Sequence, residues 1–168
     1  MAQLIISLLQ KEIEQEAAST RKMLALIPDD KMDFKPHEKS MVMKQLALHI
    51  AEIPTWSKLA VDTESINFAD SYDAPVYDKN ADLMAVFEKS SADGLEALAR
   101  ANDELILNGT WTMYYGEHKI GTLTKYETIR HSLSQTAHHR AQLGVYLRLL
   151  NIPIPGVYGP SADDSMGF

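Results

Sequence analysis

The sequence contains no cysteine, which removes disulfides, thiolate metal ligands and a cysteine nucleophile from consideration. A chain without cysteine is compatible with the cytoplasm, where we expect this protein to reside. No apolar run approaches the roughly 20 residues that cross a bilayer, so we expect no membrane partner. The first residues lack a basic region and a small-residue cleavage site, and they are predicted to begin a helix rather than a signal peptide.

Positive charge is also scarce. The formal net charge is −7, and no stretch of the chain is a basic run. Broad binding to a phosphate backbone is therefore disfavoured, and we expect no nucleic-acid partner. The 168 residues, of which 45% are hydrophobic, suit a single domain over residues 1–168 with one sizeable core.

Apolar residues recur at spacings of three and four, which predicts amphipathic helices. Four segments show this pattern: residues 3–26, 40–61, 80–105 and 124–150. Ser40 and Asn80 are the expected N-caps of the second and third, and Pro54 should interrupt the second. Thr124 with Glu127 forms a capping-box pattern at the start of the fourth. Gly94 is expected to be a mild helix defect, of about 1 kcal/mol relative to alanine at an exposed position.

One segment favours strands instead. Residues 110–115 are β-prone, and Gly116 offers a turn before residues 117–121. Residues 62–79 show no periodicity and are predicted to be a long connection, of the kind that is often functional. The expected fold is therefore all-α, a four-helix bundle with a small β-hairpin between helices 3 and 4.

Histidines on the inner faces of helices are the candidates for chemistry. His49 lies on the apolar stripe of the second helix, and His139 lies four residues after Gln135 on the last. Side chains at i and i+4 share a helix face and can grip one ion. Histidines that face each other across a bundle can build a metal pocket, although a lone histidine on an apolar stripe is more often a core residue. His131 stands about 12 Å from His139 along a straight helix and cannot share its ion.

The neighbours of these histidines have simpler interpretations. Glu52, three residues after His49, can serve as a second-shell partner, a general base or an ordinary solvated carboxylate. His138 points about 100° away from His139 and is expected to be a buried, hydrogen-bonded side chain or an interface residue. Arg140 is expected to tie its helix to a neighbour, and exposed surface is the default for Gln142.

Two segments resemble a known family. The stretch HSLSQTAHHRAQLGVYLRLLNIPIPGVYGPSADD, residues 131–164, resembles the C-terminal signature of the DinB-like four-helix-bundle family. The stretch DFKPHEKSMVMKQLALHIAEIPTW, residues 33–56, resembles its first metal-binding region. The combination of an HHRxQ turn with an earlier helix-borne histidine is fairly specific, and the likeness covers almost the whole chain.

The resemblance implies a metalloenzyme fold that is often a homodimer. Three histidines typically hold a divalent ion, commonly nickel or zinc, with open coordination positions. Some members are thiol transferases that use low-molecular-weight thiols, others are described as metal-dependent hydrolases, and many have no known substrate. For this chain we expect a small-molecule substrate, with a low-molecular-weight thiol as one candidate. Carried over by position, His49 and His139 are metal ligands.

The third ligand position holds Gln135, where the family pattern has histidine. An amide oxygen is a weaker donor than imidazole for zinc or nickel. Three interpretations follow: Gln135 ligates through its carbonyl oxygen, it holds a metal-bound water, or the site is empty and hydrogen-bonded. Replacement by His131 requires a bulge in the helix.

Two functions follow from these residues. The first is a metal-dependent enzyme, a hydrolase or thiol transferase, with His49, Gln135 and His139 at the metal and Glu52 as catalytic base. The second is a non-catalytic bundle with a degenerate site that binds a small molecule or associates with itself. The family name also suggests nucleic-acid binding, but the negative charge opposes it.

Overall fold

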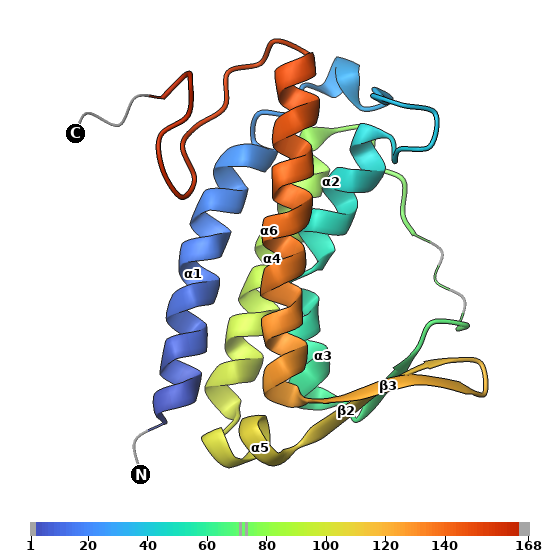
Figure 1. Cartoon of the computed structure of the whole chain (residues 1–168), viewed down its shortest axis with the longest axis vertical. Helices are drawn as coiled ribbons and strands as arrows, with labels where there is room; N and C mark the ends of the chain where they lie inside the picture. Colours follow the sequence, from blue (N-terminus) through green and yellow to red (C-terminus); the bar gives the residue numbers. More distant parts are fainter. Residues whose placement is uncertain (1–2, 71, 73, 165–168) are drawn as a thin grey trace.

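Four helical rods run side by side, and a small sheet extends from one end of them (Figure 1). The computed structural model describes residues 3–70, 72 and 74–164. Its helices are α1 (Leu4–Leu24), η1 (Asp29–Lys31), α2 (Met43–Glu52), α3 (Thr55–Asp62), α4 (Asn80–Arg100), α5 (Asp103–Asn108) and α6 (Lys125–Leu149). Its strands are β1 (Ser65–Asn67), β2 (Thr110–Tyr115) and β3 (His118–Thr124). The predicted helical bundle with a small β element before the last helix is confirmed.

The break at Pro54 divides the second rod into α2 and α3, as predicted. A Cβ atom on Gly94 of α4 would stand 2.9 Å from the Pro54 carbonyl oxygen and 3.3 Å from Ser57 Cβ. Gly94 is therefore not an exposed helix defect. It is the buried point at which α4 approaches the kinked rod most closely, where a side chain has no room.

Several predicted boundaries were wrong. α2 begins after Val42 rather than Ser40, and Gln45 reaches back to the Val42 amide. The third rod ends at Arg100, and Asn102 caps the separate helix α5 with a 2.8 Å bond from the Leu105 amide. Extended backbone at residues 101–102 separates α4 from α5, whereas the sequence pattern predicted one helix over residues 80–105.

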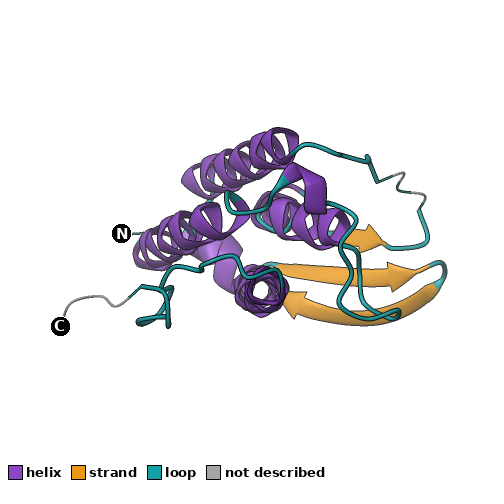
Figure 2. Cartoon of the chain, turned by 90° about the horizontal axis from the view of Figure 1, so that it is seen from above, coloured by secondary structure: helices purple, strands orange, loops and turns teal. Residues whose placement is uncertain are grey.

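The sheet is larger than the predicted hairpin. β2 and β3 form that hairpin around Gly116, whose φ of 61° suits glycine. β1, from the connection predicted to lack structure, pairs in parallel with β2. Three strands then extend to one side of α6 (Figure 2). A three-residue strand is too short to produce an alternating signal.

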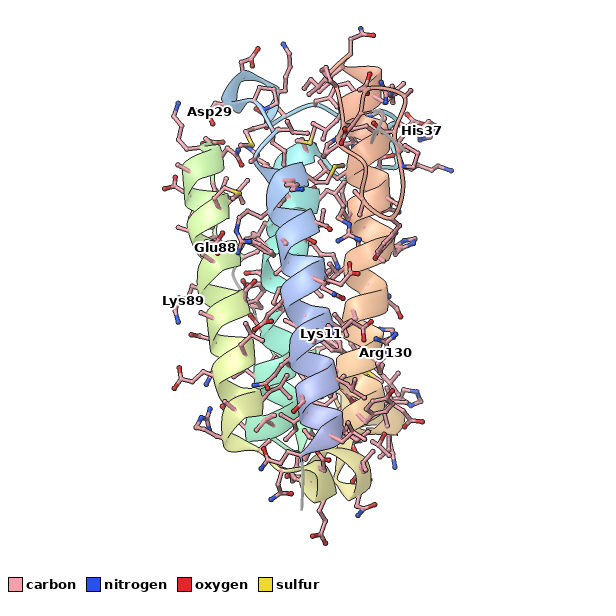
Figure 3. All side chains as sticks on the ribbon, turned by 90° about the vertical axis from the view of Figure 1, so that its left-hand side faces the viewer. Lys11, Asp29, His37, Glu88, Lys89 and Arg130 are labelled. Carbon is pink, nitrogen blue, oxygen red and sulfur yellow. The ribbon has the colours of Figure 1, made fainter. Side chains whose placement is uncertain are left out.

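The core consists of two apolar clusters stacked along the bundle. One contains Leu24, Leu46 and Phe87, and the other contains Ile6, Leu98 and Ile129. Ion pairs join the rods at the surface. One of them links Arg21 of α1 to Glu88 of α4, and Glu88 is labelled in Figure 3. No helix within the described ranges has the length and apolar character needed to cross a membrane.

Lys125, at the start of α6, is a buried cation. Its Nζ donates to the carbonyl oxygens of Ala60 at 2.8 Å and Thr63 at 2.7 Å, and it lies 3.2 Å from a Glu64 carboxylate oxygen. The ammonium therefore satisfies carbonyls at the C-terminal end of α3, where a positive charge also suits the helix dipole. This contact fixes α3 against α6 below the histidines.

Candidate metal centre

His49 of α2 and His139 of α6 meet where these two helices pack together. Their imidazole rings stand edge to face, with centroids 4.5 Å apart and planes at 84°. His49 is exposed, and His139 is half-buried. The structure thus places the two predicted histidines at one point from separate rods.

A chain of side-chain hydrogen bonds holds His139 in place. Its Nδ1 lies 2.8 Å from Gln142 Oε1, and the Gln142 amide nitrogen lies 3.2 Å from Nε2 of His138. Because an amide nitrogen can only donate and its oxygen only accept, His139 donates through Nδ1–H in this arrangement. In the neutral imidazole, the other ring nitrogen, Nε2, then carries a lone pair.

That lone pair faces Gln135, one helical turn earlier. Nε2 of His139 lies 3.0 Å from Oε1 of Gln135. Two acceptors at this distance repel each other unless a proton or a cation lies between them. Donor atoms of adjacent ligands on one transition-metal ion stand about 3 Å apart, since each is about 2.1 Å from the ion. A proton on Nε2, which makes the contact an ordinary hydrogen bond, removes this repulsion, and so does a divalent cation.

The donor set is two imidazoles and one amide oxygen. No group of three histidine, cysteine, aspartate or glutamate side chains suited to an ion occurs within residues 3–70, 72 and 74–164. The third polar side chain beside the two histidines is the amide of Gln135, which is not one of these residue types. The set fits zinc or nickel more weakly than three imidazoles would.

Glu52, one turn after His49 on α2, has a phenol as its partner. The hydroxyl of Tyr72 donates to Oε1 of Glu52. Partial burial and then the Glu52 carboxylate raise the pKa of Tyr72 to about 12. Tyr72 comes from the aperiodic connection between β1 and α4, and no pattern in the sequence singled it out. A carboxylate and a phenol thus stand together at the end of α2.

The remaining histidines do not supply a third imidazole. α6 is a continuous α-helix without a bulge, and the ring of His131 lies 5.9 Å from that of Trp56, away from His139. His138 is exposed rather than buried, although it is hydrogen-bonded as predicted. His37 is in a loop and His118 begins β3, and both are exposed.

The sequence predicted the contacts of Arg140 correctly but not those of Gln142. Arg140 ties α6 to α1, as expected, because its Nη1 bonds the Thr20 hydroxyl at 3.0 Å and the Glu16 carboxylate at 2.8 Å. Gln142 is not ordinary exposed surface, since its oxygen fixes the His139 ring. An i, i+3 amide after a helix-borne histidine is the signal that could have revealed this role.

Aromatic surface lies farther along α6, and open space lies beside Gln142. The ring of Trp56 stands 6.3 Å from Phe68, 5.5 Å from Trp111 and 5.9 Å from His131, which is about two helical turns from His139. A cavity of about 480 Å³ is lined by residues 36 and 39–41 together with Gln142. Partial burial, and then the neighbouring His139, lower the pKa of His49.

Comparison with known proteins identifies the family. A sequence profile described as the DinB family matches residues 1–166. A DinB-like protein from Bacillus cereus has a similar structure, with a TM-score of 0.71 and 21% identity, over 89% of this chain and 95% of that one. A DinB-like protein from Bacillus subtilis gives 0.66 and 17%, over 89% and 96%. At these identities the two structures show the fold alone. Among curated proteins, none matches the chain.

Proposed function

The chain belongs to the DinB family, and from that premise we propose that His49, Gln135 and His139 form a divalent-metal site that serves a hydrolase or thiol transferase. The observation that carries the proposal is the placement of His139. Its ring lies 4.5 Å from that of His49, and its lone-pair nitrogen faces the Gln135 oxygen at 3.0 Å. Zinc and nickel are the ions that suit imidazole donors.

A divalent ion in this site would supply Lewis acidity and lower the pKa of a water or thiol bound to it. The chain itself positions the donors. Gln142 accepts the Nδ1 proton of His139 and so directs Nε2 toward the site. Because the protein has no cysteine, any thiol nucleophile must come from a low-molecular-weight co-substrate.

Glu52 is the group available to take up a proton. It stands on the same helix as His49 and receives a hydrogen bond from Tyr72, which holds the carboxylate in one orientation. The cavity of about 480 Å³ beside Gln142 offers room for the body of a small substrate. These proposed roles favour an enzyme that acts on a small molecule over a protein that binds another protein.

The test is metal binding by the tag-free protein. Titration calorimetry with zinc and with nickel should give one site per chain, which His49→Ala and His139→Ala should each abolish. His37→Ala and His118→Ala are matched controls, since both residues are exposed and away from the pair. Equal metal affinity in all four variants would contradict the proposed site at His49 and His139.

Activity is tested on the metal-loaded protein. Hydrolysis of p-nitrophenyl esters represents the hydrolase class, and glutathione addition to monochlorobimane represents thiol transfer. Glu52→Gln should lower turnover while leaving metal affinity unchanged. If the wild type binds no metal but Gln135→His does, the alternative holds: a non-catalytic bundle whose site has degenerated at Gln135.

A further inference from the structure

A second hollow lies on the face of α6 that points away from the histidines. It has a volume of about 420 Å³ and is lined by α6, by Met23 of α1 and by residues 154, 155, 157 and 158 of the C-terminal segment, which runs beside these helices (Figure 1). Its walls are mostly apolar: Met23, Ala141, Gly144, Val145, Leu149 and Ile154. At 100° per residue, Ala141 and Gly144 are on nearly the opposite side of the helix from Gln135 and His139. The hollow is therefore independent of the proposed metal site.

Arg140 gives this apolar cavity a polar end. Its side chain is 3% exposed, and Nη1 bonds groups on α1. Nη2 is buried and has no hydrogen-bond partner among the described residues. A buried donor without a partner destabilises the folded state, and does so more strongly when the group is charged. A hydrogen-bond acceptor at this end of the cavity would offset that destabilisation.

Tyr158 covers the guanidinium. Its ring centroid lies 5.0 Å from Cζ of Arg140, and both residues line the cavity. Because Tyr158 is 73% exposed, its ring can turn into solvent with little loss of buried area. Such a movement breaks the 2.8 Å hydrogen bond from the Tyr158 hydroxyl to Glu16 and the cation–π contact with Arg140. Nη2 is then open to a molecule in the cavity.

The charges at the cavity are already balanced. Glu16 pairs with Arg140 at 2.8 Å, and Asp163 pairs with Arg148, another lining residue, at 2.5 Å. An anionic ligand would add an unpaired negative charge beside Glu16 in a site of low polarity, which is costly. A neutral acceptor carries no such cost.

We propose that this cavity binds a neutral, mainly apolar small molecule whose single carbonyl or hydroxyl oxygen accepts a hydrogen bond from Nη2 of Arg140. The apolar walls take the body of the ligand, and Arg140 sets its orientation. A volume of a few hundred cubic ångströms is typical of small-molecule sites.

The probe is Prodan, a neutral naphthalene with one ketone whose emission shifts to the blue in apolar surroundings. We expect saturable binding with a blue shift. N,N-dimethyl-2-naphthylamine, which has the same ring system without the ketone, should bind roughly tenfold more weakly, since it makes no bond to a charged donor. Absence of saturable Prodan binding would overturn the proposal.

Ala141→Phe places a ring in the cavity and should weaken Prodan binding at least about tenfold. Ala92→Phe is its matched control, because Ala92 is an exposed alanine on α4 outside the cavity. Arg140→Lys keeps the charge opposite Glu16 and should remove the advantage of the ketone. Equal binding by the two phenylalanine variants would overturn the location. Tighter binding of the anionic dye anilinonaphthalene sulfonate than of Prodan would overturn the neutral ligand.

Discussion

The imidazole of His49 meets that of His139 edge to face, with ring centroids 4.5 Å apart, although one residue comes from α2 and the other from α6. Only the packed bundle brings them together. Around this pair, the structure arranges one amide that faces the free nitrogen of His139 and another that fixes its ring. We therefore expect Gln135 and Gln142 to determine how tightly the two histidines bind a metal ion.

Replacing Gln135 by histidine should strengthen metal binding. Imidazole is a better donor than an amide oxygen for zinc and nickel, and the i, i+4 relation to His139 is retained. We expect a gain of tenfold or more in affinity, which corresponds to about 1.4 kcal/mol. Titration against a competing chelator dye measures it. Gln135→Leu, with no donor, should bind more weakly than the wild type, and equal affinities for all three proteins would contradict this role of residue 135.

Gln142 should matter for metal affinity although it does not touch the ion. Gln142→Leu removes the acceptor for Nδ1–H of His139 and should reduce zinc affinity roughly 10–100-fold. Gln142→Glu keeps an acceptor at the same place and should restore or exceed wild-type affinity. The same dye competition distinguishes the two variants, and a leucine variant that binds like the wild type would refute the positioning role.

Partial burial of Tyr72 and its bond to Glu52 predict an unusual alkaline titration. The pKa of Tyr72 is raised from 10 to about 12, so the folded protein holds this proton more tightly than the unfolded chain. The associated stabilisation is present in full below pH 10 and disappears as the pH rises through about 12. Tyrosinate absorbance of the wild type minus that of Tyr72→Phe should therefore show a midpoint near 12, whereas a midpoint near 10 would mean that Tyr72 is neither partly buried nor bonded to Glu52.

Lys125→Met should destabilise the fold without affecting the metal ligands. The change leaves the Ala60 and Thr63 carbonyls without the ammonium that now bonds them. Two buried, unpaired acceptors predict a loss of about 2–4 kcal/mol in the free energy of unfolding, measured with urea. Lys11→Met is the control: Lys11 is exposed on the outer face of α1 (Figure 3) and should change stability by less than about 0.5 kcal/mol.

Gly94→Ala should also destabilise, against the rule that alanine favours helices. The new Cβ would meet the Pro54 carbonyl oxygen at 2.9 Å, which is backbone and cannot turn aside. We expect a loss of about 1–3 kcal/mol from this overpacking. Ala92→Gly, at an exposed position of the same helix, should cost about 1 kcal/mol through propensity alone. A more stable alanine variant at 94 would show that α3 and α4 are not in close contact.

The helices were largely predictable because their evidence is local. Apolar periodicity, the Pro54 break and the Thr124–Glu127 capping box each depend on residues a few positions apart, and the structure confirms them. β1 depends instead on pairing with β2, which is distant in sequence, and three residues carry too little pattern to reveal it. The close approach at Gly94 was hidden for the same reason.

In the candidate site, too, some residues were predictable from the sequence and others depended on contacts between distant segments. The resemblance pointed to His49 and His139, and the structure brings them together. Tyr72 could not be predicted, because its contact with Glu52 depends on the path of an aperiodic segment. Gln142 follows His139 by three residues, which is about one helical turn. The sequence does not distinguish a solvated glutamine from one that hydrogen-bonds a histidine, because that depends on how the helix packs.

Anomalous scattering tests the central claim most directly. Crystals of the tag-free protein equilibrated with nickel should be measured at the nickel absorption edge. The account predicts one strong peak within coordination distance of imidazole nitrogens of both His49 and His139 and of the Gln135 carbonyl oxygen. A map with no peak between these residues, or with nickel only on the exposed His37, His118 or His138, would contradict it.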